Sequence, residues 1–191
     1  MVLYTYTTGG FFMKDIYILL TKSDTLFSKA IYKITRAEYT HASISLDREL
    51  TKLYSFGRKY RYSMLPAGFV HEDINRGVMG SSDTMKCALY RIRISERSYR
   101  RLANRIRHME ANRESYRYNI MGIPLCMFGI ARERKNHFFC SQFVSGVLVK
   151  SGAVERDALG APSLTHPSDL QRLPKASRVF EGTMAELRLG A

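Results

Sequence analysis

The stretch "NHFFCSQFVSGVLVKSG", residues 136–152, predicts a short helix that begins near Cys140. Its apolar side chains recur at helical spacing and end before a glycine, a common helix stop: Phe143, Val144, Val147, Leu148 and then Gly152. The free amides and the dipole at a helix start favour a thiolate, so Cys140 is a candidate nucleophile. The competing interpretation is that Cys140 is a small apolar residue packed beside Val144 and Val147. The helix pattern alone leaves both interpretations open.

A nucleophilic cysteine needs a base, and His41 stands out among the five histidines. It lies in "YTHASISL", residues 39–46, whose alternation of apolar and polar residues predicts a strand. His41 shares the polar face with small serines, so its ring can address a groove; the alternative is an exposed strand histidine. The remaining histidines are expected at the surface: His71, His108, His137 and His166. HExxH and HxH spacings are absent, so no metal ion is expected.

The length of 191 residues predicts one domain over 1–191, with residues 1–12 as a dispensable leader. The expected elements, in chain order, are a strand over 15–22, a helix over 23–36, a hairpin of 39–46 with 50–57, a short strand around 68–72, a strand over 87–95, and an amphipathic helix after it. Residues 120–131 are apolar and are expected in the core or along an acyl groove. Beyond Gly152 we expect a proline-containing tail that runs through "THPSDLQRLP" to "SRVFEG".

The net charge of +13 is concentrated between Lys86 and Arg117, where ten Lys or Arg stand against three acids. A basic face of this kind attracts an anionic polymer or an anionic lipid surface. Apolar residues at core-facing spacing in the Arg-rich segment favour a solvated face over a specific nucleic-acid reader. Walker, GxGxxG and GxSxG motifs are absent, which argues against nucleotide binding and serine hydrolysis. No cofactor is expected.

The three cysteines are far apart, and their odd number supports neither a disulfide framework nor a zinc site. This use of cysteine is typical of a reducing compartment. The apolar runs are shorter than the roughly 20 residues that a membrane-spanning helix needs. We therefore expect a cytoplasmic location.

An ordered set of segments resembles the circularly permuted NlpC-type papain-like cysteine hydrolases, a family related to the lecithin retinol acyltransferase branch. The segments are "YTHASISLD", "LYSFGRK", "YRYN", "FFCSQFVSGVL" and "HPSDL". The resemblance implies an α+β papain-like fold, in which an antiparallel sheet packs against the helix carrying the cysteine. It also implies that Cys140 is the nucleophile and His41 the base.

The third catalytic residue is less well matched, because the family places a polar group on the strand after the histidine and this chain offers Ser55. Glu72, in "FVHED", is the alternative orienting residue. The hairpin register is expected to decide between them. A three-residue turn over 47–49 would set Ser55 opposite His41, whereas a four-residue turn would set Phe56 there.

The implied reaction is acyl transfer through a Cys140 thioester, with the backbone N–H of Cys140 as an oxyanion donor. A peptidase or amidase acting on peptide-like, cell-wall-type substrates is the first interpretation. A lipid acyltransferase or thioesterase with the same Cys–His pair is the second. The third is a non-catalytic polyanion binder that uses Arg97, Arg101 and Arg105.

Overall fold

The computed structural model describes residues 12–22, 38–58 and 66–190. Six strands form one antiparallel sheet in the order β4-β3-β2-β1-β5-β8. The strands are β1 (Met13–Thr21), β2 (His41–Ser45), β3 (Leu53–Arg58), β4 (Ala67–Glu72), β5 (Lys86–Ser95) and β8 (Ala176–Thr183). The protein is therefore mixed α and β, as the segment pattern predicts, and its sheet is antiparallel, as the family resemblance implies.

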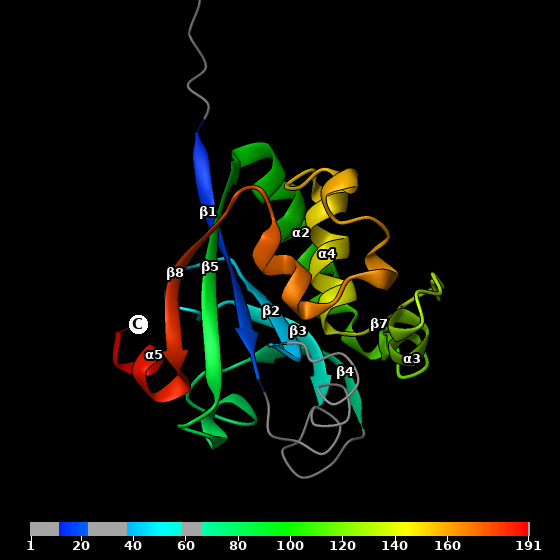
Figure 1. The fold of residues 1–191 in the computed structure, drawn as a ribbon. Coiled ribbons are helices and arrows are strands. Elements are labelled where there is room, and N and C mark those ends of the chain that lie inside the picture. The colour runs from blue at the N-terminus through cyan, green and yellow to red at the C-terminus, as the bar shows by residue number, and fades with distance from the viewer. Residues whose placement is uncertain (1–11, 23–37, 59–65, 191) are drawn as a thin grey trace, which may run out of the picture.

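In the described part of the chain, two helices cover one face of the sheet: α2 (Glu96–Ala111) and α4 (Cys140–Ser151) (Figure 1). The main core lies between these helices and that face, because the alternation of each strand sends Ile18, Ala42 and Ile44 toward it. A smaller core on the other face contains Tyr17, Leu19 and Met184. Both faces of the central strand β1 are thus buried, which explains its continuous apolar sequence.

Helix α2 confirms the amphipathic pattern of the Arg-rich segment. Leu102, Ile106 and Met109 are buried against the core, and the arginines predicted on the solvated face are exposed. Ser95 caps the helix by accepting a hydrogen bond from the Ser98 N–H. The basic side chains of α2 are therefore free to face solvent.

Helix α4 begins at Cys140 and ends at Ser151, and it is capped by Gly152, whose φ of +73° is the left-handed conformation that glycine adopts easily. The helix is buried on nearly every side because it lies between α2, the sheet and the 3₁₀ segments that follow it. Cys140 is therefore held in a buried setting and not on a mobile surface loop.

The remaining described elements are short, with seven residues or fewer each. They are η1 (Met79–Ser81), η2 (Arg113–Ser115), β6 (Arg117–Tyr118), α3 (Gly122–Met127), β7 (His137–Phe138), η3 (Arg156–Ala158), η4 (Pro162–Leu164), η5 (Pro167–Arg172) and α5 (Met184–Gly190). Strands β6 and β7 pair in parallel, apart from the main sheet. The predicted helix over 23–36 and nearly all of the predicted leader lie outside the described residues.

The hairpin between β2 and β3 differs from both predicted registers. Ile44 pairs with Tyr54 and Ser45 with Leu53, so the connection is longer than three or four residues. Asp47 organises this turn by accepting hydrogen bonds from the Thr51 N–H at 2.8 Å and the Thr51 hydroxyl at 2.6 Å. Leu50, with φ 56°, is buried in the smaller core and so belongs to the turn, not to the strand. If this register is extended beyond the two observed pairs, Ser55 lies opposite Ser43 and Gly57 lies opposite His41.

Two further expectations need correction. The tail beyond Gly152 contains an edge strand, β8, which pairs with β5 around a register shift at Leu89 and Tyr90. The apolar patch over 120–131 is mostly not core, since Ile120, Met121, Phe128 and Ile130 are exposed. Among the described residues, no helix has the length and apolar character that crossing a membrane requires.

Phe143 links α4 to the sheet, and its loss should weaken the fold. Its ring is 1% exposed and lies 5.2 Å from the Phe56 ring and 5.7 Å from the Phe69 ring, between centroids. Phe143→Ala should lower the free energy of unfolding by about 3–5 kcal/mol in urea denaturation. Phe128→Ala is the matched control: at 81% exposure, it should change stability by less than about 0.5 kcal/mol. Equal losses for the two variants would contradict this packing.

Candidate active site

Cys140 lies at the place where β2 and β3 separate. The two strands pair at Ile44 and Ser45 and not further along β2. The Leu46 N–H, just after β2, donates to Lys52 O. Because backbone amides alternate in direction along a strand, the amides of residues 42 and 44 point to the same side, toward β3. The Ala42 N–H is thereby released from the ladder and donates to the Cys140 sulfur, as does the Ser141 N–H. The thiol from α4 thus occupies the gap that opens between two strands of the sheet.

His41, at the start of β2, lies between a carboxylate and this thiol. Its Nε2 is 3.0 Å from Glu72 Oε1 and 3.3 Å from the Ser43 hydroxyl, which itself donates to the other Glu72 oxygen. The imidazole also forms a hydrogen bond with Cys140. Because Glu72 and Ser43 engage Nε2, Nδ1 is the ring nitrogen left for the sulfur. The three side chains form the row Glu72, His41, Cys140.

The charges of this row determine how it titrates. Burial disfavours the imidazolium, but the Glu72 carboxylate outweighs it and, with the bond to Cys140, raises the pKa of His41 to about 10. Burial likewise favours a neutral thiol. The His41 hydrogen bond and charge, with the Ala42 and Ser141 amides, nevertheless hold the pKa of Cys140 below its ordinary value. The pair therefore favours a thiolate beside an imidazolium more strongly than an isolated cysteine and histidine would.

Of the two candidate orienting residues, Glu72 and not Ser55 hydrogen-bonds His41. Burial raises the pKa of Glu72, but His41 and Ser43 outweigh burial and lower it. Ser55 is buried beside the carboxylate, where its hydroxyl helps lower the pKa of Glu72 but makes no hydrogen bond of normal geometry. The structure therefore places Ser55 beside Glu72, and Ser55 does not hydrogen-bond His41.

Two neighbours of Cys140 were given no role by the sequence pattern. Burial and the charge of Cys140 hold the pKa of Tyr118 well above its ordinary value, so a neutral tyrosine hydroxyl lies near the thiolate. Gln142, on the first turn of α4, accepts hydrogen bonds from the Phe139 N–H and from the Asn119 side chain. These bonds fix the start of α4 against the segment after β6. Only the motif "YRYN" hinted at this region.

The other two cysteines are not activated. Burial and the Glu186 charge raise the pKa of Cys87 to about 12. Burial and the Asp169 charge raise the pKa of Cys126 to about 11, although its sulfur lies 3.7 Å from His166 Nε2. His166 is thus half-buried beside a thiol, whereas it was expected at the surface. Neither pair has the carboxylate, imidazole and lowered thiol pKa found at Cys140.

The arrangement can perform nucleophilic chemistry. A thiolate at a helix start, an imidazolium that can return a proton and a carboxylate that orients the ring are the parts that acyl transfer requires. No protein-family model matches the sequence, and a search of curated proteins likewise finds no match, so a functional assignment rests on this geometry and on the residue pattern.

Proposed function

We propose that the protein is a cysteine hydrolase that cleaves an amide bond, as a peptidase or amidase, through a Cys140 thioester. The observation that carries this proposal is His41, which hydrogen-bonds both Glu72 and Cys140 and so joins the carboxylate to the thiol. A packing cysteine has no need of a charged histidine or a buried carboxylate beside it. Burying these groups is costly, which supports a role in chemistry.

The proposed family is the circularly permuted NlpC-type branch of the papain-like hydrolases. Two features support it: the strand with His41 precedes the helix with Cys140 in the chain, and that helix packs on an antiparallel sheet. Glu72 supplies the polar partner of the histidine in this chain.

The reaction follows from the same geometry. The Cys140 thiolate attacks the carbonyl carbon, forming a carbon–sulfur bond, and the carbonyl oxygen takes the negative charge. The Cys140 N–H, in the first turn of α4, lacks an acceptor within its helix and is suited to bind that oxygen. His41 then gives its proton to the leaving amine. Neutral His41 next takes a proton from water, which hydrolyses the thioester and restores the thiolate.

A lipid acyl substrate is the second candidate, and one observation favours it. Met121, Phe128 and Ile130 are exposed in the residues that flank α3, and the Asn119 bond to Gln142 ties this segment to the start of α4. Such side chains can contact an acyl chain at modest cost. In this case the thioester would be resolved by a second acceptor or by water.

A chromogenic ester or amide probe tests the proposal directly. Incubation should add the acyl mass to Cys140 in intact-protein mass spectrometry, and peptide mapping should locate it there. Cys140→Ala and His41→Ala should each reduce turnover by at least about 10³-fold, as loss of a nucleophile or its base does in other hydrolases. Circular dichroism checks that both variants fold. Acylation that survives in Cys140→Ala would refute the assignment.

A further inference from the structure

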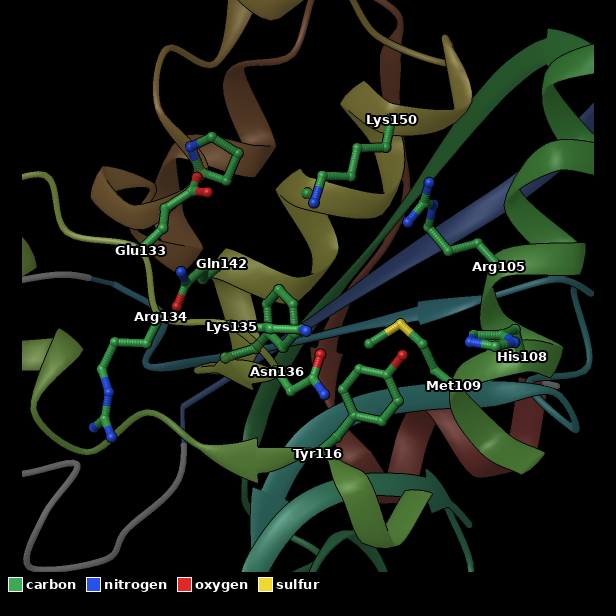
Figure 2. Close-up of a pocket in the computed structure, with 13 residues that line it drawn as sticks. Arg105, His108, Met109, Tyr116, Glu133, Arg134, Lys135, Asn136, Gln142 and Lys150 are labelled. Atoms are coloured by element: carbon green, nitrogen blue, oxygen red, sulfur yellow. The ribbon is translucent and has the colours of Figure 1, made fainter. Parts of the chain in front are cut away.

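A pocket of about 290 Å³ opens between α2, α4 and the segment that precedes β7 (Figure 2). It lies along the side of α4 that carries Gln142, Gly146 and Lys150. Its apolar part consists of Met109, Tyr116, Phe138 and Pro162. Its charged part is strongly one-sided, with four Lys or Arg side chains and, among the described residues that line it, a single acid, Glu133.

Three of these cations converge from three different elements. Figure 2 shows Arg105 of α2, Lys150 of α4 and Lys135 of the segment before β7 pointing toward the pocket centre, whereas Arg134 extends away from them. Within the described part of the chain, none of these three converging side chains forms an ion pair or hydrogen bond. Like charges held around one space repel each other, and an anion placed between them would offset that cost.

Gln142 adds a neutral donor to the same pocket. Its side chain is 3% exposed, and its amide oxygen already accepts bonds from Asn119 and the Phe139 N–H. The amide NH₂ is therefore the group that this residue can offer to a ligand. A fixed donor at the wall, a planar guanidinium and two ammonium groups suit an oxyanion with several acceptor oxygens.

We propose that this pocket binds a phosphate group, as a monoester or a diester. Phosphate carries enough acceptor oxygens and charge for the Arg105, Lys135 and Lys150 groups together, and the pocket leaves room for an organic substituent against Met109 and Tyr116. The site makes no use of the Cys140 sulfur, so it stands whether or not the hydrolase function does.

Calorimetric titration of the full chain with inorganic phosphate and with glycerol phosphate, at low salt, tests the site. Saturable one-to-one binding should weaken about 10-fold in Lys150→Gln and in Arg105→Gln, since each removes a charge-assisted hydrogen bond. Arg134→Gln is the matched control: it removes the same charge nearby from a side chain that extends away, and it should weaken binding less than about 2-fold. Cys140→Ala should bind like the native chain.

Flotation with vesicles distinguishes the two sources of the phosphate. A lipid headgroup would be identified if the protein bound phosphatidylglycerol vesicles more tightly than glycerol phosphate, and if replacing Lys150 or the exposed Phe128 abolished the vesicle binding. Glycerol phosphate binding with no response to vesicles would identify a free phosphate compound. Either result supports the site. Two results would overturn the site. One is that none of these ligands binds saturably up to about 10 mM, the range of weak sites. The other is that Arg134→Gln and Lys150→Gln lose equal binding affinity.

Discussion

At pH 7, iodoacetamide should alkylate Cys140 at least about 100 times faster than Cys126 or Cys87 in the folded protein. The three side chains are similarly buried, at 5%, 6% and 1% exposure, so ionisation and not access should separate them. A pKa of about 11 leaves roughly 0.01% of Cys126 as thiolate at this pH, and Cys87 has less. The pKa of Cys140 is instead held below its ordinary value, so its thiolate fraction exceeds the roughly few per cent of an unperturbed cysteine.

Peptide mapping after short exposures measures this ratio. His41→Ala should slow labelling of Cys140 sharply, because it removes the hydrogen bond and the positive charge that lower the thiol pKa. In concentrated urea the three rates should become similar, since the environments that separate them are lost. Similar rates in the folded native chain would contradict an activated thiol and favour the interpretation of Cys140 as packing.

Glu72→Gln should reduce turnover of an acyl probe by about 10²–10⁴-fold, whereas Ser55→Ala should have little effect. An isosteric amide keeps the shape of Glu72 but removes the charge that raises the pKa of His41, while the burial that lowers this pKa remains. A comparable loss follows when the carboxylate of a serine protease triad is replaced by its amide. Ser55 contributes only through its effect on Glu72.

The pH profile gives this prediction a second readout. Activity should rise as Cys140 ionises and fall near pH 10, where the native His41 loses the proton that the leaving group needs. In Glu72→Gln the alkaline fall should move to lower pH, because the pKa of His41 is no longer held up. A loss in Ser55→Ala as large as that in Glu72→Gln, or an unmoved alkaline limb in Glu72→Gln, would show that Glu72 is not the orienting group.

Local patterns of the sequence were enough to predict the strands around residues 15–22, 39–46 and 87–95, and the helices at 96 and 140. These segments bury a face of fixed periodicity, so the spacing of apolar residues reports their structure directly. The local pattern does not indicate strand β8, because β8 is an edge strand with no buried residue. Its pairing with β5 is a long-range contact that leaves little trace in local hydrophobicity.

The sequence by itself determined the two groups of the candidate chemistry, Cys140 at a helix start and His41 on a strand face beside Ser43. It did not decide the partner of the histidine, because Leu50 anchors the turn and sets a register that neither short turn would give. Only the tertiary structure brings Glu72 across β3 to His41 and directs the released Ala42 amide to the sulfur. The physical reason is that strand pairing and helix docking, which act between distant segments, set these distances, whereas side-chain periodicity reports only which face of its own element each residue occupies.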